Sequence, residues 1–307
     1  MPRPDHERRP LTGRRLLRRL PGRPATAALG GTVPRSLPRW YSWVYAPAMP
    51  PRPSPSLAPT VPDRPSPSPN ERSGAVPVAT VHRLTHPPPG HLLPPDRIWY
   101  ASYGSNMDAA RLRYYLRGGR PPGAARTYPG CRDRRPPLRS EAIEFPGRLY
   151  FATESPVWRG GRAFYDWAAD GSVWGRAHLI TAGQFSDIAT QEMYEAPGAD
   201  LDFTEVLADG RSVLGPGRYE TLVLLGHLDD VPVLTFTAPW HLTEVPLTRP
   251  SGPYLLYLAR GLLTDGVRDA AAVALYLSRC PGAADAWSLD ELAGLIAELG
   301  PGPARSS

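Results

Sequence analysis

The uneven distribution of proline is the feature that most constrains what this chain can fold into. Of its 40 prolines, 23 lie within the first 100 of 307 residues, in stretches such as P-P-R-P-S-P-S-L-A-P. These stretches lack the regularly spaced apolar residues that would offset the conformational entropy lost on folding. We therefore predict a mostly disordered Arg/Pro-rich tail over residues 1–95, one folded domain over residues 96–300, and a disordered C-terminus over residues 301–307.

The positive charge also belongs to the tail. The first 100 residues contain 15 arginines and 5 acidic residues, whereas the rest of the chain has 20 arginines against 24 acidic residues. Within the tail, residues 14–20 (R-R-L-L-R-R-L) could form a short basic amphipathic helix that contacts phosphate or a membrane surface. A solvated arm is the simpler interpretation, and we therefore do not expect contact with nucleic acid or membrane.

Several chemistries are excluded by residues that the sequence lacks. It contains no lysine, so a P-loop lysine and a Schiff-base lysine are both ruled out. Cys131 and Cys280 form no C-x-x-C pair, and His178, His227 and His241 have no partner at H-x-x-x-H spacing. We expect no metal site and no cofactor.

The N-terminal arginines are not followed by an apolar run of the length found in signal peptides or membrane-spanning helices. The sequence therefore predicts a cytoplasmic protein.

A candidate ligand-binding turn lies in residues 98–107, I-W-Y-A-S-Y-G-S-N-M. A β-prone run stops at Tyr103, Gly104, Ser105 and Asn106, and a helical pattern begins. Glycine lets the backbone adopt a positive φ or pass close to a ligand, and the free N–H groups that begin a helix can bind an anion. An ordinary turn would use the same residue types, so both interpretations remain open at this point.

The helix after this turn should be capped by Asn106 or Asp108 and should end at Gly118. The Gly-, Pro- and Arg-rich residues 118–141 then predict a long irregular loop. Its arginines either recognise a substrate carboxylate or only solvate the loop. They surround Cys131 with positive charge that favours a thiolate, although a cysteine without a histidine base is more simply incidental.

The remaining patterns alternate between strand and helix. A hairpin turn at Asp229 and Asp230 joins the last two predicted strands. Capping boxes open two helices, from Thr181 to Gln184 and from Ser288 to Glu291. Strands are predicted over residues 142–145, 148–152, 162–168, 172–180, 218–228 and 231–238, and helices over residues 181–194, 254–262, 267–279 and 289–299. The pattern indicates a mixed α+β domain.

Glu192 is the candidate catalytic residue. Helical spacing from Phe185, Ile188 and Ala189 places this carboxylate on the apolar side of the helix that begins at Thr181. A buried carboxylate without partners is costly, so it must find hydrogen bonds or hold a proton more readily, which would suit proton transfer. Alternatively, Glu192 reaches solvent beside Glu195 at the helix end.

Three separated segments resemble one family in the order in which that family has them: Y-G-S-N-M, the strand and helix S-V-W-G-R-A-H-L-I…Q-E-M-Y, and P-S-x-x-Y-L-x-x-L-x-x-G-L. The chain is similar to the γ-glutamylcyclotransferase-like family over roughly residues 98–266. The resemblance implies a small closed or nearly closed mixed β-barrel with flanking helices. It also implies cleavage of a γ-glutamyl amide by intramolecular cyclisation, which releases pyroglutamate.

The resemblance also assigns roles to residues. Tyr103, Gly104, Ser105 and Asn106 would hold the glutamyl group through backbone N–H groups, Glu192 would be the catalytic acid and base, and Tyr219 would lie near the pocket. The chain departs from the family pattern at Ala189, where many relatives have an acidic residue, and at Met193, where they have glycine.

Two other functions remain alternatives at the level of sequence. The same scaffold could bind a small anionic amide without turnover, or it could transfer the acyl group to water and release glutamate. The small-molecule γ-glutamyl substrate is the partner that we expect first.

Overall fold

The computed structural model describes residues 80–86, 95–121 and 126–300. Most of the predicted tail, residues 1–79 and 87–94, and the predicted disordered C-terminus, residues 301–307, lie outside the described residues. None of the helices in the described segments is long and apolar enough to cross a membrane.

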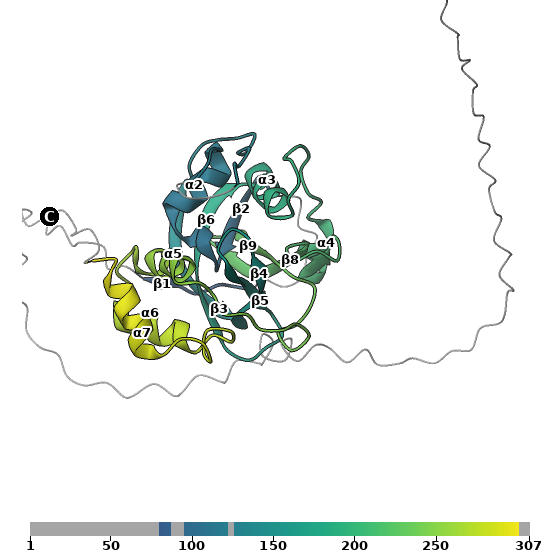
Figure 1. Ribbon diagram of the computed structural model, residues 1–307. Helices are drawn as coiled ribbons and strands as arrows, with labels where there is room; N and C mark the ends of the chain where they lie inside the picture. Colours follow the sequence, from purple (N-terminus) through teal and green to yellow (C-terminus); the bar gives the residue numbers. More distant parts are fainter. Residues whose placement is uncertain (1–79, 87–94, 122–125, 301–307) are drawn as a thin grey trace, which may run out of the picture. The chain divides into compact units, whose positions relative to one another are not determined.

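A seven-stranded mixed sheet forms the centre of the domain (Figure 1). Its spatial order is β1-β3-β6-β2-β9-β8-β7. The strands are β1 (Val81–His82), β2 (Arg97–Ser102), β3 (Arg139–Pro146), β6 (Ser172–Thr181), β7 (Arg211–Val213), β8 (Thr221–Leu228) and β9 (Val231–Thr237). The two remaining strands, β4 (Arg148–Ser155) and β5 (Gly160–Asp166), pair with each other in a separate antiparallel sheet.

The expectation of a closed or nearly closed barrel is wrong. Closure requires every strand to pair on both sides. In the described part of the chain, the end strands β1 and β7 do not pair with each other, so the seven-stranded sheet is open. Part of the range 1–95, which we predicted to be mostly disordered, is ordered as strand β1. Its residues Val81 and His82 pair in parallel with Ala142 and Ile143 of β3.

In the described residues, the helical segments are η1 (Ser105–Met107), α2 (Ala109–Arg117), α3 (Ala182–Glu192), α4 (Thr204–Asp209), α5 (Gly252–Leu263), α6 (Ala270–Ser278) and α7 (Leu289–Ala297). Both predicted capping boxes are present, at Thr181 before α3 and at Ser288 before α7. Asp229 and Asp230 both have positive φ in the turn between β8 and β9, as a tight hairpin requires. The α+β class is therefore confirmed.

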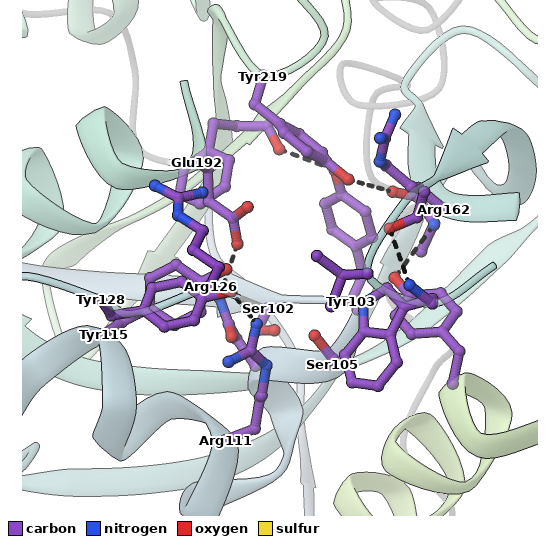
Figure 2. Close-up of a pocket in the computed structure, with 18 of the residues that line it drawn as sticks. Ser102, Tyr103, Ser105, Arg111, Tyr115, Arg126, Tyr128, Arg162, Glu192 and Tyr219 are labelled. Atoms are coloured by element: carbon purple, nitrogen blue, oxygen red, sulfur yellow. Dashed lines mark hydrogen bonds between the residues drawn. The ribbon is translucent and has the colours of Figure 1, made fainter. Parts of the chain in front are cut away.

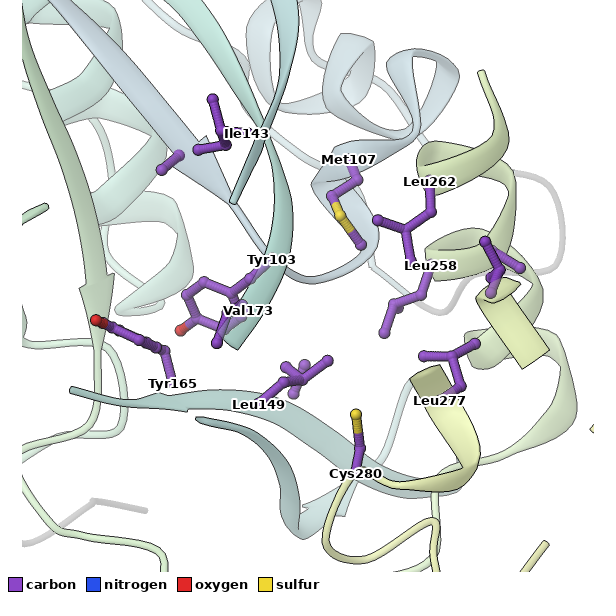
Figure 3. Close-up of a cluster of buried hydrophobic side chains, with 14 of the residues drawn as sticks. Tyr103, Met107, Ile143, Leu149, Tyr165, Val173, Leu258, Leu262, Leu277 and Cys280 are labelled. Atoms are coloured by element: carbon purple, nitrogen blue, oxygen red, sulfur yellow. The ribbon is translucent and has the colours of Figure 1, made fainter. Parts of the chain in front are cut away.

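Strand β2 separates two large groups of buried apolar side chains. Its alternate residues Ile98 and Tyr100 pack with side chains of α2 and α3, whereas Trp99 and Ala101 belong to the group that α5, α6 and α7 cover. Figure 3 shows part of this second group, in which Met107 faces Leu258 and Leu262 of α5. The turn after β2 therefore lies between two packed layers.

Helix α5 fixes this turn by a close contact. A Cβ atom on Gly261 would lie 2.4 Å from the Cβ of Met107 and 2.7 Å from its carbonyl carbon. Only glycine allows the helix to approach η1 this closely. The glycine of the segment P-S-x-x-Y-L-x-x-L-x-x-G-L thus has a structural role in positioning the candidate ligand-binding turn.

Candidate functional site

A small cavity of about 70 Å³ lies where the turn after β2 meets the C-terminal end of α3 (Figure 2). Since one water needs about 10–15 Å³ on this measure, the cavity has room for roughly five waters or a small organic group. Its walls hold seven tyrosines, three arginines and one carboxylate. The lining residues are Tyr100, Ser102, Tyr103, Gly104, Ser105, Asn106, Arg111, Tyr115, Arg126, Tyr128, Ser155, Val157, Trp158, Arg162, Ala163, Glu192, Tyr194, Tyr219, Phe236 and Tyr254.

Every site residue predicted from the sequence lines this cavity: Tyr103, Gly104, Ser105, Asn106, Glu192 and Tyr219. The elements that supply them are far apart in the sequence. The first four follow β2, Glu192 is the last residue of α3, and Tyr219 lies in the turn before β8 rather than inside the predicted strand.

The turn leaves backbone donors free. Within the described chain, the N–H groups of Gly104, Ser105 and Asn106 have no hydrogen-bond acceptor, whereas those of Met107 and Asp108 bond to the carbonyls of Gly104 and Ser105. Asp108, rather than Asn106, caps α2 by accepting a 2.8 Å hydrogen bond from the N–H of Arg111.

Gly104 does not need a positive φ, because its φ is −112°. An added Cβ would lie 3.4 Å from the Tyr254 hydroxyl and 3.7 Å from the Cβ of Ala163, which are ordinary van der Waals distances. Tyr254 and Ala163 also line the cavity, so the absence of a side chain on Gly104 leaves space in the cavity beside these two residues.

The carboxylate of Glu192 is half-buried and faces the turn across the cavity (Figure 2). Its Oε1 accepts a 3.2 Å hydrogen bond from Nδ2 of Asn106, which also donates to the Tyr100 hydroxyl at 3.3 Å. Glu192 therefore does not extend into bulk solvent at the end of α3, because its carboxylate accepts a hydrogen bond from Asn106 in the cavity.

A buried histidine supports Asn106 from behind. His178 is 1% exposed, and its Nε2 lies 3.2 Å from the carbonyl oxygen of Asn106 while its Nδ1 lies 2.8 Å from Oγ of Ser140. Burial, together with the nearby charge of Arg176, lowers the pKa of His178 to about 3. At neutral pH the ring is therefore uncharged and holds the turn by donating a hydrogen bond to that carbonyl.

Several tyrosine hydroxyls are used for structure. Tyr103 donates to the carbonyl of Phe236 at 2.8 Å, and Tyr219 donates to the carbonyl of Ala163 at 3.2 Å. The hydroxyl of Tyr254 accepts a 3.1 Å hydrogen bond from the N–H of Ala163. Burial raises the pKa of all three phenols above the ordinary value, so they stay neutral and shape the cavity wall.

The three cavity arginines have no carboxylate partner within salt-bridge distance in the described segments. Arg126 donates to the carbonyl of Gln191 at 2.9 Å and Arg162 donates to Oγ1 of Thr153 at 2.9 Å. Arg111 donates to the hydroxyl of Tyr128. With one carboxylate and three guanidinium groups, the cavity wall has a net positive charge that favours an anionic ligand.

The arginines of the loop after α2 lie in two different environments, either on the cavity wall or in salt bridges with aspartates. Arg126 lines the cavity, as the substrate-recognition interpretation required, whereas Arg132 pairs with Asp187 and Asp200, and Arg135 pairs with Asp133.

Cys131 is an incidental buried cysteine. It is 2% exposed, and burial together with Asp187 and Asp133 raises the pKa of its thiol to about 12, so a thiolate is not favoured there.

Sequence reasoning missed Arg111, Arg162, Tyr115, Tyr128, Trp158 and Tyr254 as cavity residues. Tyr254 had a signal, because it stands in the P-S-x-x-Y-L segment, although there we predicted only a helix over residues 254–262 and no cavity residue. Arg111 had a weaker signal. It occupies a buried position of the short helix α2, and arginine is seldom buried unless it binds a partner. Arg162 and Trp158 come from the β4–β5 hairpin, and no local pattern marks them.

No group of three or more His, Cys, Asp or Glu side chains among the residues that the structure describes is arranged to hold a metal ion.

Comparisons with known proteins give a partial and uneven match. No family model matches the chain. Histone deacetylase 5 of Arabidopsis thaliana is 33% identical over 189 residues, which cover 55% of this chain and 28% of that protein. The chain therefore spans little more than a quarter of the length of this curated relative.

Among solved structures, a gamma-glutamyl cyclotransferase shares 15% identity at a TM-score of 0.34, over 56% of this chain and 81% of that chain. An uncharacterised protein from Homo sapiens shares 16% identity at a TM-score of 0.34, over 56% and 82%. YkqA from Bacillus subtilis shares 18% identity at a TM-score of 0.29, over 54% and 48%. Likenesses this weak do not place the chain in a family.

Proposed function

We propose that this protein cleaves a γ-glutamyl amide by intramolecular cyclisation and releases pyroglutamate and a free amine or peptide. One observation carries the proposal: the carboxylate of Glu192 and the free backbone N–H groups of Gly104, Ser105 and Asn106 line one small cavity. A proton acceptor and a set of hydrogen-bond donors therefore line the same space.

The reaction needs no nucleophile from the protein. The α-amino nitrogen of the substrate attacks its own γ-carbonyl carbon, a new C–N bond closes the five-membered ring, and the bond to the leaving nitrogen breaks. The α-ammonium nitrogen loses two protons on its way to the lactam N–H, one before it attacks and one after. Glu192 accepts each in turn and passes each to the leaving nitrogen, which departs as the amine and ends as its ammonium form. One carboxylate therefore completes the proton balance, and the only products are pyroglutamate and the amine.

The rest of the cavity supports this chemistry by positioning. The γ-carbonyl oxygen becomes negatively charged in the tetrahedral intermediate, and backbone N–H groups of the turn can stabilise it. Ring closure also requires the glutamyl chain to fold so that nitrogen and carbonyl carbon meet, and a cavity walled by aromatic rings restricts the extended forms. Asn106 keeps the Glu192 carboxylate oriented toward this space.

The proposal is tested by incubating the full-length protein with γ-glutamyl amino acids, γ-glutamyl amines and larger γ-glutamylated metabolites, with the products identified by mass. We expect pyroglutamate from at least one class and loss of its release in Glu192→Gln. Free glutamate would instead indicate hydrolysis. Ligand-dependent thermal stabilisation without any product would indicate a binding protein. Pyroglutamate release that is unchanged in Glu192→Gln would contradict the role of Glu192 as the catalytic acid and base.

A further inference from the structure

Arg111 is the least satisfied charged group in the described part of the chain. Its side chain lies on α2 and lines the cavity, yet the residue is only 4% exposed. Two of its donor nitrogens, Nε and Nη1, are buried and have no hydrogen-bond partner, and only Nη2 has one, the hydroxyl of Tyr128. A guanidinium carries five N–H donors in a fixed plane, so most of this group is unused.

Aromatic rings surround the guanidinium and hold it in place. Its Cζ lies 4.6 Å from the ring centroid of Tyr128, 5.0 Å from that of Tyr115 and 5.7 Å from that of Trp158. Such contacts stabilise a cation through the faces of the rings, but they leave its in-plane N–H donors unbonded. The rings therefore fix the orientation of a cation whose hydrogen bonds remain to be made.

Burial of a cation is costly, and no salt bridge of Arg111 offsets this cost among the described residues. The carboxylate of Glu192, the one carboxylate that lines the cavity, attracts the guanidinium from a distance and accepts its hydrogen bond from Asn106. Nη2 has a second N–H besides the one that Tyr128 accepts, and this N–H shares a guanidinium edge with unbonded Nε or with unbonded Nη1. Such an edge matches the two oxygens of a carboxylate. A ligand carboxylate would supply the missing partner.

We propose that Arg111 binds the α-carboxylate of the substrate through the second N–H of Nη2 and the unbonded nitrogen beside it, and thereby restricts the enzyme to γ-glutamyl compounds whose α-carboxylate is free. This inference rests on the proposed function. The α-carboxylate and the α-amino group sit on the same carbon, so a substrate held at Arg111 presents its nitrogen within the space that Glu192 faces. Figure 2 shows both side chains directed toward this space from opposite walls.

The other two cavity arginines are weaker candidates for this contact. Arg126 already donates to the carbonyl of Gln191, and Arg162 already donates to Thr153. Both are also more exposed than Arg111, so a contact with either would gain less from exclusion of water. Arg162 therefore serves as the matched control, with the same side chain and the same cavity.

The test measures binding to the Glu192→Gln variant, which does not consume its ligand. Calorimetry compares γ-glutamyl methylamide with the analogue whose α-carboxylate is converted to a primary amide. A charge-assisted pair of hydrogen bonds contributes about 1.5–3 kcal/mol, so the carboxylate form should bind roughly 10- to 100-fold more tightly. Adding Arg111→Met should reduce this preference to near unity, whereas adding Arg162→Met should leave most of it.

Arg111→Lys covers the case in which the methionine variant does not fold. It keeps the charge but loses the planar pair of donors, so the carboxylate preference should fall to an intermediate value. A carboxylate preference that stays at the Glu192→Gln level in either Arg111 variant would overturn the inference. Failure of the proposed function would look different, because the wild-type protein would then release no pyroglutamate from any compound in the panel.

Discussion

Arginine is used in two opposite ways around helix α3. On the loop side, Arg132 places its Nε 2.9 Å from Oδ1 of Asp187 and also pairs with Asp200, while its backbone N–H donates to Asp187 at 2.8 Å. On the cavity side, Arg111 is buried against aromatic rings and forms no salt bridge with a carboxylate of the described segments. Paired arginines tie a loop to a helix, whereas an unpaired one is kept for a ligand, at a cost to stability.

The largest effects should separate the two carboxylates of α3 from each other. Glu192→Gln should lower the rate of pyroglutamate release by about 10²- to 10⁴-fold, the range that a positioned acid or base contributes, and should leave the unfolding temperature nearly unchanged. Asp187→Asn should do the reverse, since Asp187 is buried and accepts three contacts from Arg132. Rate per folded molecule and thermal unfolding, measured on both variants, provide the check. A stable but inactive Asp187→Asn protein would contradict a purely structural role for Asp187.

The next effect compares two arginine deletions by stability alone. Arg132→Met leaves the buried Asp187 carboxylate with one backbone hydrogen bond and should reduce the free energy of unfolding by about 2 kcal/mol. Arg111→Met removes a buried cation that has no salt-bridge partner and two unbonded donor nitrogens, and it should leave this free energy unchanged or raise it. Urea denaturation measures both. If Arg111→Met is the more destabilising of the two, Arg111 is a structural residue.

A pH effect of somewhat smaller size should come from His178, which also lies buried without a counter-ion. Its pKa is about 3 in the fold and about 6.5 when unfolded, so between these values only the unfolded state binds the proton. The stability contributed by neutral His178 is therefore complete above pH 6.5. It falls as pH drops toward 3, by up to about 1.4 kcal/mol per pH unit.

Urea denaturation of the wild type and of His178→Gln at pH 7, 6 and 5 isolates this contribution. Burial also lowers the pKa of His86 and His227, so these residues give both proteins a slope of the same sign. The wild type should show the steeper loss on acidification. Equal slopes would mean that His178 is charged in the fold.

The smallest effect on stability should come from Gly104→Ala. The added methyl group meets only ordinary contacts, and φ of −112° suits any residue, so the free energy of unfolding should change by less than about 0.5 kcal/mol. The methyl group lies beside cavity residues, and substrate affinity should therefore fall more than stability does. Measured KM and unfolding temperature separate the two. A large drop in stability would show that the turn cannot accommodate a side chain.

Local chemistry in the sequence predicted much of the secondary structure. The capping boxes at Thr181 and Ser288, the hairpin turn at Asp229 and the helix end at Gly118 all depend on residues within a few positions of one another. The same is true of the alternating strand that ends at Thr181. Such features can be predicted from the sequence because the interactions that stabilise them join residues close together in the chain.

The sheet order and half of the cavity wall were not predictable in this way. Strand β1 pairs through only Val81 and His82, which are too few to form a pattern, and the sheet stays open because of pairings between distant segments. Arg111 and Tyr254 meet at the cavity although their helices are far apart in the chain. The resemblance named Glu192 and the turn as site residues where periodicity left two interpretations open, and the structure shows that they line one cavity.

The close contact between Gly261 and Met107 also bears on when the site can exist during synthesis. The turn, Arg111 and Glu192 all leave the ribosome well before α5 is made. Until Gly261 emerges and α5 docks, η1 lacks the helix that fixes it, and β2 lacks its parallel neighbour β9. A nascent chain that ends before residue 231 therefore holds most of the candidate site residues but cannot yet assemble them.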